Sequence, residues 1–164
     1  MSLHFRCVLL SYPKTKSHML DIQIYDAINR PNELEKRKIV DFLFDNLEQY
    51  GDEKTHIQRA IDYSIKEISS FGGFTLVAKE NDTIQATVVV NQTGMGGYIP
   101  ENILVYIATH KQNRGKGLGK EMMNKAISHA KGDIALHVEA NNPAKFLYEK
   151  LGFTNPYLEM RLKK

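Results

Sequence analysis

Nine residues decide how this chain is organised: Gln112-Asn113-Arg114-Gly115-Lys116-Gly117-Leu118-Gly119-Lys120. They follow an apolar run at 103–108 that is typical of a strand, and they precede a helical pattern that extends to about Lys131. The glycines lack Cβ atoms, so successive backbone N–H groups can turn toward one anion. The positive end of the following helix dipole adds to this attraction. The stretch is therefore predicted to bind a phosphate group.

The spacing of the glycines excludes the two common nucleotide-binding loops. A Walker A loop needs glycine at position 114 and a hydroxyl residue at position 121, where this chain has Arg114 and Glu121. A dinucleotide fingerprint needs a third glycine where Lys120 stands. A glycine-rich turn without a ligand remains the alternative to a phosphate site.

The composition indicates one soluble globular domain. The chain has 164 residues, of which 42% are hydrophobic, enough for one sizeable core and too few for two. We expect residues 1–19 to be a peripheral extension and residues 20–164 to form a single domain. The net charge of +3 is spread without a long block of one sign, which argues against nucleic-acid and membrane partners.

Cysteine and histidine usage indicates neither a disulfide nor a metal site. Cys7 is the one cysteine of the sequence, and no paired Cys or His spacing suggests metal ligands. No apolar run reaches the length of a membrane span, and the N-terminus lacks a signal-peptide core. We therefore expect a cytoplasmic protein.

Periodicity and capping signals predict the order of the elements. This order is a strand at 20–25, a helix after Asn32, a helix from about Thr55, strands at 74–79, 84–90 and 102–109, the helix after the glycine stretch, a strand at 134–140, a helix after Asn142 and a last strand at 158–162. Glu35 and Gln58 complete predicted capping boxes with Asn32 and Thr55. The strands at 74–79 and 84–90 form a hairpin, and those at 102–109 and 134–140 are parallel neighbours. The glycine-rich loop at 92–100 is either a plain connection or a lid over a ligand.

Two motifs resemble those of the GNAT superfamily of N-acetyltransferases. The first, Gln112-x-x-Gly115-x-Gly117, resembles the acetyl-CoA-binding motif of that family, and the second, Val138-x-x-Asn141-x-x-Ala144-x-x-x-Tyr148-x-x-x-Gly152-Phe153, resembles its second signature. The clear match covers about 103–153, and the element order extends it weakly to Leu20. The resemblance implies an α/β fold with a mixed, mostly antiparallel central sheet flanked by helices. Its parallel fourth and fifth strands would be splayed around acetyl-CoA.

The same resemblance implies an acetyl-CoA site without a metal. Amides of 112–119 would bind the pyrophosphate, and the basic side chains of the stretch would flank the phosphates, although a solvated basic face is the alternative for each. The strand backbone and Asn141 would hold the pantetheine arm. The expected cofactor-binding residues are Ile107, Ala108, Thr109, Gln112, Asn113, Arg114, Gly115, Lys116, Gly117, Leu118, Gly119, Lys120, Asn141 and Ala144.

Tyr148 is the catalytic residue that the resemblance implies. A phenol with a pKa near 10 stays protonated at neutral pH and can donate a proton to the departing CoA sulfur. The alternative is a core residue, because Tyr148 shares one helical face with Ala144, Leu147 and Leu151. The general base remains open among Glu101, Tyr106, His110, His137 and Glu139, the last two being expected on a covered face.

The sequence thus predicts an N-acetyltransferase, an acyltransferase that moves an acetyl group from acetyl-CoA to a primary amine of a small molecule or peptide. The amine would attack directly in a ternary complex. A non-catalytic acyl-CoA-binding or sensing domain on the same fold is the alternative. The expected partners are acetyl-CoA and an amine acceptor, and the protein is a monomer or a homodimer.

Overall fold

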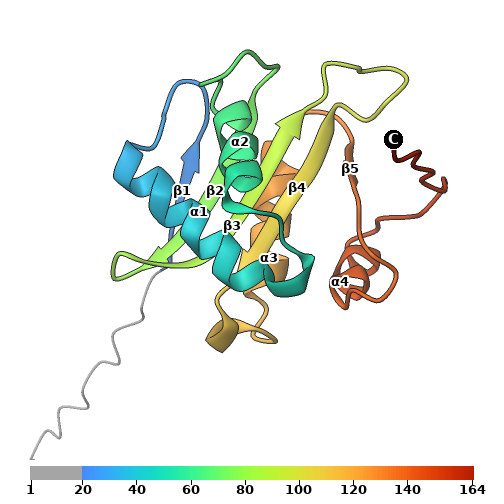
Figure 1. Cartoon of the computed structure of the whole chain (residues 1–164). Helices are drawn as coiled ribbons and strands as arrows, with labels where there is room; N and C mark the ends of the chain where they lie inside the picture. Colours follow the sequence, from blue (N-terminus) through green and yellow to red (C-terminus); the bar gives the residue numbers. More distant parts are fainter. Residues whose placement is uncertain (1–19) are drawn as a thin grey trace, which may run out of the picture.

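The computed structural model describes residues 20–164, so the expected extension at 1–19 lies outside the described residues (Figure 1). Its strands are β1 (Asp21–Tyr25), β2 (Gly73–Glu80), β3 (Thr83–Gln92), β4 (Asn102–Thr109) and β5 (Ile134–Leu136). Its helices are α1 (Glu33–Leu47), α2 (Lys54–Ser64), α3 (Leu118–His129) and α4 (Ala144–Lys150), with two 3₁₀ turns, η1 (Glu48–Tyr50) and η2 (Lys111–Asn113).

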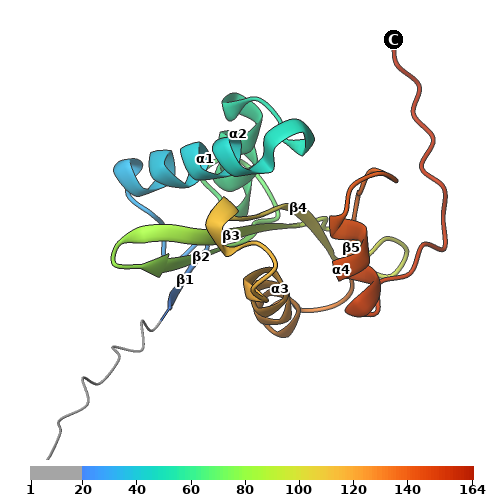
Figure 2. The same ribbon diagram turned by 90° about the horizontal axis from the view of Figure 1, so that it is seen from below.

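Over residues 20–164 the strands form one five-stranded sheet in the order β1-β2-β3-β4-β5. Strands β1 to β4 pair with one another in antiparallel fashion, and β5 pairs with β4 in parallel. Helices α1 and α2 cover one face of the sheet and α3 covers the other, while α4 lies beside β5 (Figure 2). The mixed, mostly antiparallel α/β sheet expected from the sequence is confirmed.

Two apolar layers fill the spaces between sheet and helices. The layer under α1 and α2 contains Ile39, Leu43, Ile57, Ile61, Val77 and Val89, and the layer over α3 contains Leu76, Val88, Met122, Met123 and Ala126. Strands β2 and β3 therefore have side chains buried on both faces, which explains why their sequences are nearly continuous apolar runs. Each fully buried aliphatic side chain of this kind stabilises the fold by about 1.5–3 kcal/mol relative to exposure.

The capping signals predict one helix start correctly and one wrongly. The Asn32 side chain accepts from the Glu35 N–H at 2.9 Å, and the Glu35 carboxylate accepts from the Asn32 N–H at 3.0 Å, so the capping box of α1 is confirmed. Helix α2 instead begins at Lys54, and Glu53 at its cap position makes no side-chain cap bond. Thr55 lies inside the helix, so the second predicted capping box is wrong.

The hairpin between β2 and β3 turns on two residues in the left-handed region. Asn81 and Asp82 have φ values of 48° and 61°. Asn and Asp tolerate this region better than other side chains, and two such residues in succession match the twist of antiparallel strands. The predicted hairpin is confirmed.

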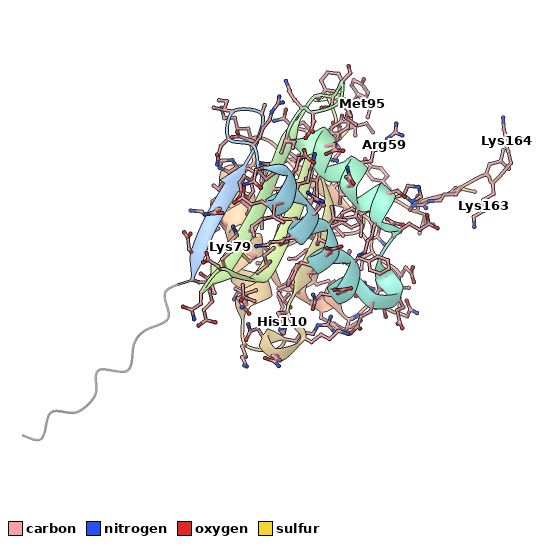
Figure 3. The ribbon with its side chains drawn as sticks, turned by 60° about the vertical axis from the view of Figure 1, so that its left-hand side comes forward. Arg59, Lys79, Met95, His110, Lys163 and Lys164 are labelled. Carbon is pink, nitrogen blue, oxygen red and sulfur yellow. The ribbon has the colours of Figure 1, made fainter. Side chains whose placement is uncertain are left out.

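The C-terminal part of the sheet is smaller than expected. Strand β5 has three residues, and the strand predicted at 158–162 is absent from the described structure. Leu158, Met160 and Leu162 alternate as a strand would, yet they are 89%, 93% and 86% exposed. Figure 3 shows Lys163 and Lys164 standing away from the body of the protein. The alternation predicted a strand, but an isolated strand has no hydrogen-bond partners to stabilise it.

The glycine-rich loop at 92–100 lies far from the glycine stretch at 112–120. Figure 3 labels Met95 in this loop and His110 just after β4, and the two residues lie at opposite ends of the sheet. The loop is held by its own neighbours, since the Thr93 hydroxyl donates to the Pro100 carbonyl at 2.8 Å. The structure therefore gives no support to a lid over the glycine stretch. Within residues 20–164, no helix is long and apolar enough to cross a membrane.

Candidate functional site

Strands β4 and β5 separate halfway along β4. They pair only at three positions, from Asn102 with Ile134 to Leu104 with Leu136. Strand β4 continues for five more residues, to Thr109, while the chain after Leu136 leaves the sheet. The part of β4 from 105 to 109 therefore has no strand paired to its β5 side.

A β-bulge on β4 marks the point of separation. Val89 of β3 pairs with Tyr106 and Val90 pairs with Leu104, so Val105 has no partner on β3. A bulge bends its strand and increases the local twist. The bend turns the second half of β4 away from β5 and leaves a backbone edge to which an extended ligand can add.

The glycine stretch forms a ring of free backbone donors at the end of β4. Gly115 and Gly117 have φ values of 74° and 89°, and a Cβ at either would meet nothing within 4 Å, so both face open space. Gly117 caps α3, which begins at Leu118. In the described structure, the N–H groups of Gly115 and of 117–120 donate no hydrogen bond to the protein. Free N–H groups at a helix N-terminus attract a phosphate.

Side chains from the same stretch hold the loop in place. The Asn113 amide donates to the Gln85 side chain on β3 at 2.7 Å. The Arg114 guanidinium donates to the Asn46 carbonyl at 2.7 Å and to the Glu48 carboxylate at 3.3 Å, at the end of α1. Arg114 therefore fastens the loop to α1, and it is a weaker phosphate candidate than the sequence indicated.

The side chains of Lys116 and Lys120 form fewer contacts with the protein than the Arg114 side chain does. Lys116 reaches the Asn113 side chain at 3.4 Å, which is a long contact for a hydrogen bond. The Lys120 side chain is exposed, and no partner for it exists among residues 20–164. These two lysines are therefore free to meet a phosphate.

Helix α4 places Tyr148 next to the glycine stretch. A Cβ on Gly119 would lie 3.6 Å from the Leu147 side chain and 3.7 Å from the Thr109 side chain, so α3, α4 and the end of β4 meet here. Tyr148 is 7% exposed and belongs to the apolar layer of α3. Its ring packs edge-on against Phe153, with 5.9 Å between ring centroids.

Burial raises the pKa of Tyr148 to about 12. An apolar environment disfavours the charged phenolate, and in the described structure no group forms a hydrogen bond to this hydroxyl. The phenol is therefore protonated at all ordinary assay pH values. Tyr148 is both a buried residue and an available proton donor, so the two readings of the sequence are compatible.

Most of the remaining expected site residues lie on the two segments that separate, which are 105–109 of β4 and the chain after β5. Ile107 and Thr109 are half-buried and Ala108 is buried, all on the unpaired part of β4. Asn141 lies on the other arm, where its carbonyl accepts from the Tyr50 hydroxyl at 3.5 Å. Ala144 begins α4, and its N–H donates to the Asn142 side chain at 2.9 Å. Gln112, in η2, is exposed, and its N–H donates to the His110 ring at 3.3 Å.

The structure separates the candidate bases. The Glu101 carboxylate accepts from the Asp133 N–H at 2.8 Å, a bond that holds its pKa below the usual value and commits it to the turn before β5. His137 and Glu139 are exposed, so the expectation that they lie on a covered face is wrong. No strand covers this face in the described structure, because the strand predicted at 158–162 does not form.

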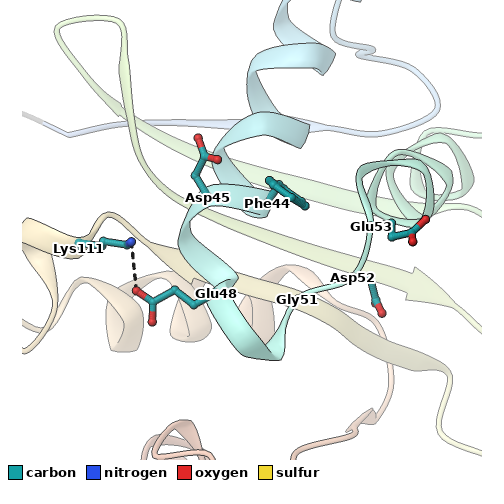
Figure 4. Close-up of a pocket in the computed structure, with 7 residues that line it drawn as sticks. All are labelled: Phe44, Asp45, Glu48, Gly51, Asp52, Glu53 and Lys111. Atoms are coloured by element: carbon teal, nitrogen blue, oxygen red, sulfur yellow. Dashed lines mark ion pairs between the residues drawn. The ribbon is translucent and has the colours of Figure 1, made fainter.

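No sequence pattern singles out Asp52, which lies between η1 and α2. The Tyr106 hydroxyl donates to the Asp52 carboxylate at 2.6 Å. Asp52 also lines a surface pocket of about 570 Å³ together with Phe44, Asp45, Glu48, Gly51, Glu53 and Lys111 (Figure 4). Within residues 20–164, no group of three His, Cys, Asp or Glu side chains could hold a metal ion.

A sequence profile of the acetyltransferase (GNAT) domain matches residues 72–155, just over half of the chain. The chain belongs to the GNAT acetyltransferase family. The matched segment contains the bulge of β4, the glycine stretch and α4. The family assignment made from the two motifs is confirmed.

Solved structures share this GNAT fold at low sequence identity. A possible acetyltransferase from Clostridium difficile 630 is 17% identical with a TM-score of 0.63, over 88% of this chain and 97% of that one. A ribosomal-protein-alanine N-acetyltransferase from Brucella melitensis biovar Abortus 2308 is 14% identical with a TM-score of 0.60, over 90% and 100%. An aminoglycoside N-acetyltransferase in complex with CoA is 10% identical with a TM-score of 0.63, over 90% and 97%. At these identities the likeness concerns the fold alone.

Proposed function

We propose that this GNAT domain transfers an acetyl group from acetyl-CoA to a primary amine of a small molecule or peptide. The observation that carries the proposal is the combination of free N–H groups at Gly115 and 117–120 with the separation of β4 and β5 beside them. We call these free N–H groups of Gly115 and 117–120 the anion cradle. A cradle at one end of an unpaired strand edge suits a ligand in which a pyrophosphate is joined to an extended arm that contains amides.

Different residues of the chain bind different parts of acetyl-CoA. The free amides of Gly115 and 117–120 hold the pyrophosphate, while those of 112–114 and Lys116 already donate to His110, Lys111 and Asn113. The Lys116 and Lys120 side chains approach the phosphates from the side. The backbone of 107–109 pairs with the pantetheine arm from one side, while Asn141 and Ala144 approach it from the other. Arg114 acts indirectly, because its bonds to the end of α1 fix the loop.

The reaction is a direct attack in a ternary complex. The amine nitrogen forms a bond to the acetyl carbon, and an N–H of β4 near the bulge stabilises the oxyanion that develops. The C–S bond then breaks, and Tyr148 gives its proton to the departing sulfur. The raised pKa of Tyr148 suits this role, since a protonated phenol is the form that can donate.

A thiol-release assay with a panel of primary amines tests the proposal. The panel contains alkylamines, diamines, amino sugars and short peptides, and mass spectrometry identifies the acetylated product. We expect release of CoA that depends on the amine, together with thermal stabilisation by acetyl-CoA alone. Stabilisation without any amine-dependent release would favour the non-catalytic acyl-CoA-binding domain, and no stabilisation at all would contradict the acetyl-CoA site.

A further inference from the structure

The segment 50–52 spans the opening between β4 and the chain after β5. At one end, the Tyr50 hydroxyl reaches the Asn141 carbonyl at 3.5 Å. At the other end, Asp52 accepts a hydrogen bond from Tyr106 of β4 at 2.6 Å. Figure 2 shows the same arrangement, with the end of α1 extending over the sheet toward the segment between β5 and α4. Asp52 therefore lies over the unpaired part of β4.

Asp52 approaches this opening from the face opposite Tyr148. The Tyr106 ring belongs to the apolar layer under α1 and α2, whereas Tyr148 belongs to the layer over α3. Tyr106 also follows directly after the bulged residue Val105, where the pairing of β4 with β5 has just ended. An acetyl group held at the bulge would thus have Tyr148 on one side and Asp52 on the other.

The hydrogen bond from Tyr106 fixes one carboxylate oxygen and leaves the second available. Tyr106 donates to Oδ2, and Oδ1 of Asp52 has no partner among residues 20–164. Burial, and then the hydrogen bond to Asp52, raise the pKa of Tyr106 above its ordinary value, so its hydroxyl remains a donor. A carboxylate oriented in this way can accept a second hydrogen bond from a ligand.

The charges around Asp52 favour a cation over an anion. The neighbouring groups that line the same pocket are Asp45 of α1, Glu48 of η1, Glu53 beside Asp52, and Lys111 of η2. Glu48 is paired with both Lys111 at 3.2 Å and Arg114 at 3.3 Å, whereas Asp45, Asp52 and Glu53 have no salt-bridge partner among residues 20–164. The remaining charge of the pocket is negative, and Figure 4 shows Asp52 and Glu53 across it from Lys111.

We propose that Asp52 binds the ammonium group of the acceptor and removes its proton, and that Tyr106 positions the Asp52 carboxylate. This inference rests on the proposed acetyl transfer, and it assigns the substrate to amines that are cationic at neutral pH. The acceptor nitrogen loses two protons. Asp52 takes the first before the attack and releases it to solvent, and the second restores on Tyr148 the proton that the phenol has given to the CoA sulfur.

The first test compares Asp52→Asn with Asp82→Asn, a matched change at the exposed turn between β2 and β3, where asparagine also tolerates the left-handed backbone. Asparagine keeps the shape and still accepts from Tyr106, so the fold is retained, which thermal unfolding checks. With the best amine of the panel at about pH 7, we expect kcat/KM to fall about 100-fold in Asp52→Asn, within the usual range for a general base. Asp82→Asn should change kcat/KM less than about threefold, and both variants should bind acetyl-CoA as the wild type does.

The second test uses the protonation of the acceptor itself. If Asp52 removes a proton, an amine that is already neutral needs it less, so the deficit of Asp52→Asn should shrink toward about tenfold or less as the pH rises to about 9.5. For the same reason, 2,2,2-trifluoroethylamine, which is neutral at about pH 7, should be acetylated by Asp52→Asn with a smaller deficit than ethylamine. A purely structural role of Asp52 would give the same deficit with both amines.

Tyr106→Phe tests the positioning role. It leaves the charge of Asp52 in place but removes the hydrogen bond, so we expect a loss of about tenfold in kcat with little change in acetyl-CoA affinity. Unchanged kcat/KM in Asp52→Asn, with a wild type that acetylates amines, would overturn this inference and leave the proposed function intact. A wild type that acetylates no amine would overturn both.

Discussion

At the scale of single residues, Tyr148 is the clearest test of the chemistry. Tyr148→Phe removes only the hydroxyl and keeps the ring, so the packing against Phe153 should persist. We expect kcat to fall about 10- to 100-fold, since proton donation to the leaving thiolate is lost, while the Kd for acetyl-CoA stays within about twofold. Steady-state kinetics and calorimetric titration check the two quantities, and unchanged kcat would remove Tyr148 from the mechanism.

The pKa of Tyr148 makes a separate prediction for the pH dependence of kcat. In the proposed mechanism the active form is the neutral phenol, which is present below the pKa, and a pKa raised to about 12 keeps it present up to about two units below that value. We therefore expect no loss of kcat through Tyr148 ionisation up to about pH 10.5. A decline in kcat with an apparent pKa near 10 that is present in the wild type and missing in Tyr148→Phe would contradict this expectation.

Local spacing in the sequence is enough to single out several of the candidate site residues. Gly115, Gly117 and Tyr148 lie in short motifs whose spacing reflects a loop and one helix face. Asp52 could not be predicted in this way, because the feature that distinguishes it is a hydrogen bond from Tyr106, which lies 54 positions later in the chain. A lone carboxylate between two helices has no pattern that distinguishes it from an ordinary loop residue.

At the scale of elements, the N-terminus of α3 depends on the backbone of Gly117. Because φ is 89° there, alanine would be strained by about 1–2 kcal/mol, and the nearby N–H groups would shift. We expect Gly117→Ala to weaken acetyl-CoA binding about tenfold. Gly119→Ala is the matched control, because its new methyl group would sit at ordinary contact distances of 3.6 and 3.7 Å and leave the fold unchanged.

Equal thermal stability of Gly117→Ala and Gly119→Ala, measured without ligand, would contradict the strain at Gly117. Equal acetyl-CoA affinity of Gly117→Ala and the wild type in calorimetric titration would contradict the role of its backbone in the cradle. The two outcomes are independent of each other, since the first concerns the helix start and the second concerns the ligand.

The loss of a polar side chain near the N-terminus should lower the unfolding free energy more for α1 than for α2. Asn32→Ala removes a cap that bonds the Glu35 N–H at 2.9 Å, and the expected cost is about 1 kcal/mol of unfolding free energy. Thr55→Ala should change stability by less than about 0.5 kcal/mol, because Thr55 lies inside α2 and makes no cap bond. Urea unfolding compares them, and equal losses would mean that the helix starts are wrongly placed.

These elements also show where periodicity succeeds and fails. The hairpin of β2 and β3 was predictable because Asn81 and Asp82 supply the turn between two apolar runs. The strand predicted at 158–162 has the same alternation but no neighbour with which to pair. Whether alternating residues become a strand depends on a partner elsewhere in the chain, and no local pattern contains that information.

At the scale of the whole molecule, the sheet brings together segments that are far apart in the sequence. The separation of β4 and β5 places the cradle at 115–120, Tyr148 and the segment 50–52 around one opening. The motif at 112–120 predicted free backbone donors, whereas the approach that we propose for the acceptor, beside Asp52, could be inferred only from the fold. The two apolar layers on either side of the sheet keep these parts in fixed relation.

Hydrogen–deuterium exchange with and without acetyl-CoA tests the placement of the cofactor most directly. The free N–H groups of Gly115 and 117–120, and those of 105–109 that face the open edge of β4, should exchange at least about tenfold more slowly when acetyl-CoA is bound, because each would gain an acceptor. Peptides covering 137–148 should also gain protection, while β1 and α2 should not change. Protection that is absent from 105–120, or that appears only between α1 and α2, would contradict the proposed acetyl-CoA site.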